Sequence, residues 1–346
     1  MIKLAPKRTI GQKLIKRLGR LVRSNYWLHT IIQSNSLYLE PIPVPTNYPT
    51  DINVEITTYC NAKCSFCTRE TVTKSGVKPV KHMEFEQVKN VIDKVRELTR
   101  QQNVPEERIQ FSPVGLGEPL LNPSFFDIVA YARQVFPKAH IHANSNCIVL
   151  KGKIAERLAG SEVDSIVLSL CFDDRETFNN LVGVEKYDTV VENIRNFLAL
   201  RGERTPRVTI HVFDKDLTAQ KYSEIVKRWN PLLRETDRLL IEKYMPLTDW
   251  SPKQGEKHPC SQLWNTMMVD IDGYVFPCCL GVWTKRDDGL CLGKITDDSQ
   301  KLLKKLAYVR QRHISGDYGI CNGCGYLTTW SGRNKKNYEA VKKLGL

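Results

Sequence analysis

Short apolar runs alternate with amphipathic stretches through the middle of the chain. β-prone runs lie at residues 52–56, 109–111, 140–142, 165–169, 208–213 and 239–243, and helix-like patterns at 85–100, 125–136, 154–158 and 190–200. Strands separated by helices in this way form parallel pairs joined by right-handed crossovers. The pattern predicts an α/β fold, a partial (β/α)6 TIM-like barrel whose chemistry lies at the carboxyl ends of its strands.

The alternation has clear limits on both sides, which predict the domain organisation. Prolines crowd residues 41–50, and after Tyr244 the rhythm stops and a cysteine-bearing tail follows. We therefore expect a basic N-terminal extension over residues 1–47, a barrel domain over 48–245 and a small C-terminal domain over 246–346. A chain of 346 residues is long enough for this arrangement.

The composition is that of a globular protein with unusual cysteine use. Apolar residues make up 41% and charged residues 26% of the chain, which argues against disorder and a fibrous class. No apolar run approaches the ~18 residues of a membrane helix, and the start lacks the apolar block of a secretory signal. We expect a cytoplasmic protein, in which eleven cysteines indicate metal ligation or thiol chemistry rather than disulfides.

Positive charge is concentrated at the start of the chain. The net charge is +13, and residues 1–50 carry eight Lys or Arg against one acidic residue, Glu40. Apolar residues recur there at helical spacing, at Ile10, Leu14, Leu18 and Leu21. The pattern predicts a basic helix in residues 1–34 that contacts a membrane, a nucleic acid or an acidic carrier peptide, or else packs on the barrel with a solvated basic face.

The strongest chemical signal is the spacing Cys60-x3-Cys64-x2-Cys67, directly after the first predicted strand. Iron–sulfur clusters are normally held by four cysteines, so three thiolates on one loop would leave one iron of a cubane cluster free for another ligand. Zinc is the competing metal, but a structural zinc site needs four closed ligands and no histidine lies near this loop.

This segment resembles the radical S-adenosylmethionine (SAM) superfamily, whose motif has this spacing and often an aromatic residue before the last cysteine, as Phe66 is here. The resemblance covers residues 48–324. It implies that Cys60, Cys64 and Cys67 hold a 4Fe-4S cluster whose open iron binds S-adenosylmethionine, with Phe66 beside the cofactor. Reductive cleavage of S-adenosylmethionine would then give a 5'-deoxyadenosyl radical that abstracts a substrate hydrogen.

Three further segments carry the resemblance. Gly117-Glu118-Pro119 is similar to the motif that binds the amino group of S-adenosylmethionine, Asn144 to a residue near its ribose, and Ser169 to a serine that contacts its carboxylate. For the glycine–glutamate segment, close backbone approach and a carboxylate suit an ammonium group. Asn144 is equally compatible with a simple turn residue.

Two positions depart from the family pattern. Cys171 stands where relatives commonly have an aspartate, and Leu181-Val182-Gly183 lacks the arginine that many relatives have before the glycine. Recognition of the carboxylate by that arginine is therefore not expected. Cys171, at a predicted strand end beside the radical site, is a candidate hydrogen-atom donor to a substrate radical.

The tail contains a second set of cysteines, Cys260, Cys278, Cys321 and Cys324, the last two as a CxxC pair. The sequence from Cys260 to Cys278, continued by the CxxC pair, resembles a SPASM domain in its shortened form, the twitch domain, because no cysteine follows Cys324. The resemblance implies one auxiliary 4Fe-4S cluster held by these four residues. Four cysteines with one CxxC pair also suit zinc.

These features predict an enzyme that oxidises its substrate, by dehydrogenation or crosslinking, with help from the auxiliary cluster. The alternative is an epimerase of a sugar or peptide that uses a cysteine thiol, of Cys171 or Cys279, as hydrogen donor. An alternative of another class is a zinc-bound nucleic-acid-binding protein. We expect a small-molecule or peptide substrate, anionic if the positive charge of the chain guides it. A reducing partner such as flavodoxin or ferredoxin is also expected.

Overall fold

The computed structural model describes residues 48–202, 206–244, 257–279, 281, 289–324, 327 and 331–345. The basic N-terminal extension and the predicted boundary near residue 245 lie outside these residues, so both stay predictions. None of the described helices has the length and apolar character needed to span a membrane.

Six parallel strands form the barrel wall, and every predicted strand corresponds to one of them. They are β1 (Asp51–Val54), β2 (Gln110–Ser112), β3 (His140–Ser145), β4 (Ser165–Phe172), β5 (Arg207–Asp214) and β6 (Arg238–Lys243). Each pairs in parallel with the next strand along the chain, so their order in the sheet is the order in the sequence. Their carboxyl ends therefore share one edge of the sheet.

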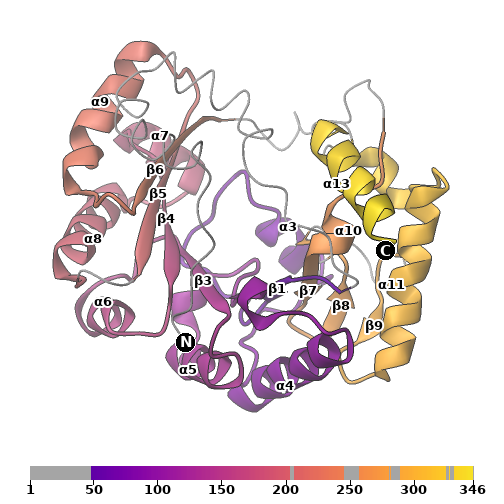
Figure 1. The fold of residues 1–346 in the computed structure, drawn as a ribbon. Helices are drawn as coiled ribbons and strands as arrows, with labels where there is room; N and C mark the ends of the chain where they lie inside the picture. Colours follow the sequence, from indigo (N-terminus) through magenta and orange to yellow (C-terminus); the bar gives the residue numbers. More distant parts are fainter. Residues whose placement is uncertain are drawn as a thin grey trace, which may run out of the picture.

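Helices and short turns connect these strands, and most of the longer helices lie on the outer side of the curved sheet (Figure 1). They are α3 (Arg69–Lys74), α4 (Phe85–Gln101), α5 (Phe125–Val135), α6 (Gly152–Ala159), α7 (Arg175–Val182), α8 (Tyr187–Leu200) and α9 (Ala219–Trp229), with short 3-10 turns η1 (Glu106–Arg108), η2 (Pro119–Leu121) and η3 (Asn230–Leu232). In α4, for example, Val88, Ile92 and Val95 form an apolar stripe that is fully buried. Burial of such stripes stabilises the helices against the sheet.

The strands show the corresponding alternation. In β5, Val208, Ile210 and Val212 are buried, whereas Thr209 and His211 are only half-buried. Successive side chains of a strand point to opposite faces, so the buried set packs against the helices and the half-buried set lies on the inner face of the sheet. This inner face is more polar than the outer one, as suits a barrel that surrounds a ligand site.

The tail continues the same sheet instead of forming a separate one. β7 (Thr266–Val269) pairs in parallel with β1, and β8 (Tyr274–Phe276) and β9 (Gly293–Lys294) follow in antiparallel pairing, giving nine strands in the order β6-β5-β4-β3-β2-β1-β7-β8-β9. The tail helices are α10 (Gln262–Asn265), α11 (Ser299–Ile314), the 3-10 turn η6 (Gly319–Gly323) and α13 (Ser331–Leu344). Figure 1 shows α11 and α13 at the opposite end of the molecule from α8 and α9.

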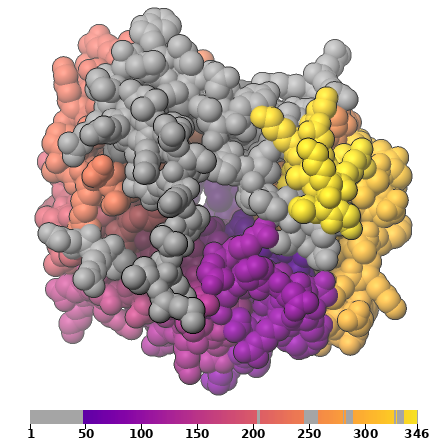
Figure 2. Space-filling view, in the orientation of Figure 1, coloured from indigo at the N-terminus to yellow at the C-terminus, as the bar shows by residue number. Residues whose placement is uncertain are grey.

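The predicted fold class is confirmed. β1 pairs with β2 on one side and β7 on the other, so the six-stranded wall does not close on itself within the described residues and remains a partial barrel. The space-filling view shows a hollow near the centre of the molecule, directly above the purple atoms of the first barrel segments (Figure 2).

Candidate functional site

The cysteine loop, residues 60–67, follows β1 at the carboxyl edge of the sheet. Cys60, Cys64 and Cys67 are all half-buried and none forms a disulfide. Burial raises the pKa of each thiol, and for Cys64 the neighbouring Cys171, Cys67 and Cys60 raise the pKa further. The three sulfurs are thus close enough to interact, as the sequence motif predicts.

Backbone hydrogen bonds to the end of α7 hold the cysteine loop. The Lys63 N–H donates to Val182 O at 3.0 Å, and the Ser65 N–H donates to Leu181 O at 2.8 Å. Gly183 ends α7 at φ +72°, and a Cβ there would lie 2.7 Å from Lys63 O, so only glycine fits without strain. Residues 181–183, which lack the arginine of the family pattern, therefore support the cysteine loop through their backbone.

The glycine–glutamate loop, residues 115–119, packs directly against the residues before Cys60. The Gly117 N–H donates to Thr57 O at 3.2 Å and the Glu118 N–H donates to Tyr59 O at 2.8 Å. A Cβ on Gly117 would lie 2.5 Å from both carbonyl oxygens, far inside contact distance. Glycine at 117 thus allows the two loops to approach each other.

The carboxyl group of Glu118 points into the protein. It is 3% exposed and accepts hydrogen bonds from Asn146 N at 2.6 Å and Leu120 N at 3.2 Å. Burial raises its pKa from 4.5 to about 7, and these hydrogen bonds together with one from Ser145 limit the rise. The carboxyl group consequently fixes the turn after β3 and is poised to change protonation near neutral pH.

An asparagine that contacts the cysteine loop is Asn146, whereas the predicted place of Asn144 near the ribose stays a prediction. The Asn146 side-chain amide donates to Asn61 Oδ1 at 2.7 Å and approaches Cys60 Sγ at 3.6 Å. Asn144 lies in β3 with an exposed side chain that bonds to His142. Sequence reasoning missed Asn146 because it stands beyond the strand, although its place at a carboxyl strand end was a usable signal.

A β-bulge places Cys171 beside the cysteine loop. The pairing of β4 with β5 shifts between Ser169 and Cys171, and Cys171 has φ +64°. Its buried thiol donates to Ser169 O at 3.6 Å. Burial raises the pKa of Cys171 to about 12, with smaller contributions from Cys60 and Cys67. The bulge interrupts the regular alternation of side chains at Cys171, which lies close enough to the cysteine loop to interact with Cys64, while Ser169 is half-buried in β4 and its predicted contact with the carboxylate stays a prediction.

Phe66 belongs to a cluster of four rings that crosses the top of the barrel. Its ring centroid lies 6.0 Å from Phe172, 6.4 Å from Phe213 and 5.9 Å from Tyr244, at the carboxyl ends of β4, β5 and β6. Edge-to-face contacts of this kind are stabilising. The cluster links the cysteine loop to the far strands of the partial barrel.

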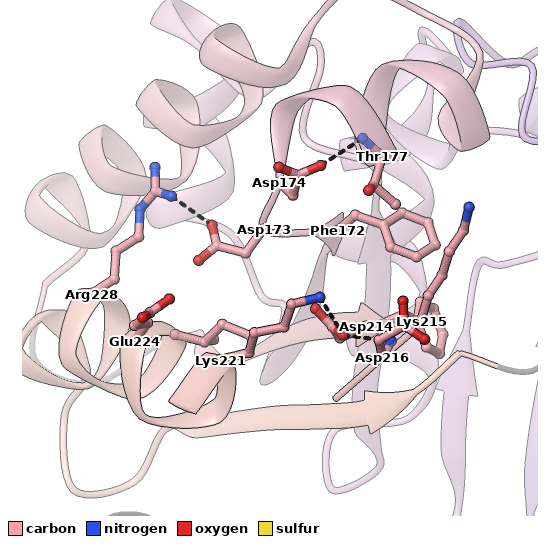
Figure 3. A pocket seen from close by; sticks show the side chains of 12 residues that line it. Phe172, Asp173, Asp174, Thr177, Asp214, Lys215, Asp216, Lys221, Glu224 and Arg228 are labelled. Atoms are coloured by element: carbon pink, nitrogen blue, oxygen red, sulfur yellow. Dashed lines mark hydrogen bonds and ion pairs between the residues drawn. The ribbon is translucent and has the colours of Figure 1, made fainter. Parts of the chain in front are cut away.

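A cavity of about 480 Å³ adjoins this ring cluster between α7 and α9. Phe172 and Phe213 line it, and Figure 3 shows Asp173 paired with Arg228 on one side and Lys221 directed toward Asp214 on the other. Five carboxylate side chains and three cationic ones line the cavity, so the positive charge of the whole chain is not concentrated there.

The tail cysteine site gathers residues that are far apart in the sequence. Cys260, Cys278, Cys321 and Cys324 line one pocket, together with Cys279 and His313. Burial raises the pKa of Cys260 to about 12, and Cys321, Cys324 and Cys279 contribute to the rise. Cys291 does not line this pocket.

His313, on α11, is a site residue that the sequence analysis missed. It is 3% exposed, and its Nδ1 accepts a hydrogen bond from the Cys260 N–H at 3.5 Å. Burial lowers its pKa to about 4, so the ring is neutral at physiological pH. His313 belongs to no sequence motif of metal-ligand spacing. It reaches the site only through the packing of α11, which a sequence does not reveal.

The donor sets fit iron–sulfur clusters. Cysteine thiolates are the usual ligands of such clusters. Burial disfavours the thiolate form of these cysteines, and bound iron would compensate the negative charge of the thiolates. The buried side-chain nitrogen of Asn61, beside Cys60, has no hydrogen-bond partner in the described structure.

Two families match the chain. The Radical SAM superfamily matches residues 54–228, which is half of the chain, and the SPASM iron–sulfur cluster-binding domain matches residues 260–325. Among curated proteins, the chain is similar to the mycofactocin maturase MftC of Mycobacterium tuberculosis, with 22% identity over 326 residues, covering 82% of this chain and 78% of MftC.

Solved structures share the fold. anSMEcpe with bound AdoMet superposes with a TM-score of 0.56 at 15% identity, covering 85% of this chain and 98% of that chain. Streptococcus suis SuiB bound to the precursor peptide SuiA superposes with a TM-score of 0.54 at 14% identity, covering 92% and 82%. The two family matches confirm the expected cofactors, a 4Fe-4S cluster, S-adenosylmethionine and an auxiliary cluster in the tail. The chain belongs to the radical SAM superfamily and carries a SPASM iron–sulfur domain in its tail.

Proposed function

We propose that this protein is a radical SAM oxidase of a peptide substrate. Cys60, Cys64 and Cys67 hold the cluster that binds S-adenosylmethionine, and the tail cysteine site holds a fully ligated auxiliary cluster. When bound, the first cluster and S-adenosylmethionine supply a 5'-deoxyadenosyl radical, which abstracts a hydrogen atom from the substrate. A flavodoxin or ferredoxin as electron donor stays a prediction.

One observation carries the choice of oxidation. Four cysteines of the tail converge on one pocket, and the tail is joined to the barrel by the pairing of β7 with β1. A cluster with all four irons ligated by protein is suited to accepting an electron from the substrate radical, not to binding substrate. Loss of that electron and of a proton completes a two-electron oxidation.

The peptide class is supported by the relatives. MftC is named a maturase of mycofactocin, and SuiB is seen with a precursor peptide. The cavity beside Phe172 and Phe213 offers this chain a place for part of such a substrate, and its excess of carboxylates favours a segment with basic or amino groups. The cavity lining therefore favours a positively charged part of the substrate, whereas the net charge of the chain alone suggested an anionic substrate.

The test is an anaerobic assay with reconstituted clusters, dithionite, S-adenosylmethionine and each short peptide encoded beside the gene. Oxidation predicts 5'-deoxyadenosine and a peptide that is about two mass units lighter. Cys321→Ala should retain 5'-deoxyadenosine formation and lose the lighter peptide. A product of unchanged mass that gains one deuterium from heavy water would contradict oxidation.

Epimerisation is the second candidate, and the bulge at Cys171 favours it. This bulge turns a buried thiol toward the cysteine loop, where it could donate a hydrogen atom to a substrate radical. Cys171→Ala should then leave 5'-deoxyadenosine formation intact and abolish the deuterium-labelled product. Full retention of labelled product in this variant would exclude the thiol as donor.

A further inference from the structure

Three charged side chains are buried together between the glycine–glutamate loop and the turn that joins β7 to β8. Lys78 Nζ lies 2.8 Å from Glu55 Oε2 and 3.3 Å from Asp270 Oδ2. The three side chains are at most 3% exposed. Charges are buried only where partners compensate them, so this cluster must be held by specific contacts.

Glu55 connects the cluster to the glycine–glutamate loop. It directly follows β1, and its Oε1 accepts the Leu116 N–H at 3.1 Å. A Cβ on Gly115 would lie 2.5 Å from Glu55 Cγ, so the loop is packed tightly on this side chain. The position of residues 115–117 therefore depends on where Glu55 is held.

Asp270 connects the same cluster to the tail. Its Oδ1 accepts hydrogen bonds from Asp272 N at 2.9 Å and Tyr274 N at 2.8 Å, which shape the turn between β7 and β8. Glu55 Oε2 also accepts the Ile271 N–H of this turn at 3.0 Å. β8 then leads within two residues to Cys278.

Lys78 is the only ammonium group in the cluster and lies between the two carboxylates. Glu55 and Asp270 together carry one more charge than Lys78 neutralises, and the N–H groups of Leu116, Ile271, Asp272 and Tyr274 stabilise the excess. The glycine–glutamate loop and the β7–β8 turn thus donate hydrogen bonds to the same pair of carboxylates. Displacement of the loop therefore changes the stabilisation of the turn, and the reverse.

We propose that Glu55, Lys78 and Asp270 are positioning residues that couple S-adenosylmethionine binding to the tail domain. The inference rests on the proposed radical SAM function and on the role in binding S-adenosylmethionine that the family resemblance implies for Gly117, Glu118 and Pro119. It assigns to Asp270, a tail residue, an effect on affinity at the barrel cluster. Neither family match describes such a connection.

The test compares Asp270→Asn with a matched variant in the protein carrying its clusters. The ligand is S-adenosylmethionine alone, and its dissociation constant is read from the change in the electron paramagnetic resonance spectrum of the reduced barrel cluster. We expect Asp270→Asn to weaken binding about 3- to 30-fold. Lys78→Gln should act in the same direction.

Asp237→Asn is the control. Asp237 forms an equally buried ion pair with Arg201 at the opposite edge of the sheet, where it also accepts the Val208 N–H. Its replacement should lower thermal stability and leave the dissociation constant unchanged. Equal weakening in both variants, or unchanged binding in Asp270→Asn, would overturn the proposal.

A measurement on the unaltered protein decides the matter if the variants do not fold. Amide hydrogen exchange, with and without S-adenosylmethionine, should show slower exchange at Ile271 and Tyr274 as well as at Leu116, but not at Val208. Protection confined to residues 115–119 would contradict the coupling. Because no substrate is involved, these outcomes are independent of whether the enzyme oxidises a peptide.

Discussion

The two cysteine sites of this molecule are built in different ways. The cysteine loop contains its three cysteines within eight residues, and close backbone contacts with residues 181–183 fix it. The tail site takes Cys260, Cys278 and the Cys321–Cys324 pair from separate segments, and α11 adds His313. One site is local and the other is assembled by the tertiary fold.

This difference matches the roles proposed for them. Three cysteines on a short loop leave one corner of a cluster for S-adenosylmethionine, and the loop lies at the edge where the barrel opens. Four cysteines from several segments surround a cluster completely and leave no corner for a ligand. The site formed by one short loop is therefore the one proposed to bind a ligand, and the site assembled from several segments is the one proposed to transfer electrons.

The sharpest way to break the comparison is to remove one ligand from each site. Cys64→Ala should abolish 5'-deoxyadenosine formation, whereas Cys321→Ala should retain it with dithionite as reductant. Each variant should fall from about eight irons per chain to about four. Iron analysis and chromatography of the nucleoside check this, and loss of cleavage in both variants would refute separate roles.

A smaller effect is expected at the contact between the two loops of the radical site. Gly117→Ala would place a Cβ 2.5 Å from two carbonyl oxygens and should reduce 5'-deoxyadenosine formation about 5- to 100-fold, because overpacking of this kind costs about 1–3 kcal/mol. Gly202→Ala, with no atom within 4 Å of the added Cβ, is the control and should retain activity. Equal rates for both variants would contradict the packing argument.

Glu118 gives the barrel site a pH dependence of stability. Its folded pKa of about 7 lies above the ordinary 4.5, so its stabilising contribution is complete below pH 4.5 and is lost as pH rises through 7. Between about pH 5 and pH 8, the cluster-free protein should lose about 2–3 kcal/mol of unfolding free energy relative to Glu118→Gln. Urea unfolding at several pH values measures this, and parallel pH profiles would disprove it.

The smallest effect is expected at Cys291, the tail cysteine that does not line the assembled site. Cys291→Ala should keep about eight irons per chain and the visible absorption of both clusters. Iron analysis checks it against Cys278→Ala, which should lose about four irons. Loss of iron in Cys291→Ala would mean that the tail cluster has another ligand set.

The locally encoded features could be predicted from sequence. The six strands follow from short β-prone runs separated by helix-like stretches, and the cysteine loop and Gly117 follow from motifs whose geometry depends on adjacent residues. The four tail cysteines were grouped by resemblance, and the structure brings them to one pocket.

Long-range features could not be predicted. The pairing of β7 with β1 joins residues more than two hundred positions apart, and no periodicity encodes such a partner. Lys78 looks like any surface lysine in the sequence, yet it is buried between Glu55 and Asp270. Asn146 contacts the cysteine loop because the chain turns after β3, and no sequence motif singled it out. These residues depend on tertiary packing that a single sequence does not reveal.

The central claim is that the barrel cluster binds S-adenosylmethionine through an open iron and the tail cluster does not. Electron–nuclear double resonance of the reduced protein with S-adenosylmethionine labelled with nitrogen-15 at its amino group tests this most directly. We predict nitrogen hyperfine coupling in the unaltered protein and in Cys321→Ala, and none in Cys64→Ala. Coupling that persists in Cys64→Ala and disappears in Cys321→Ala would contradict the account.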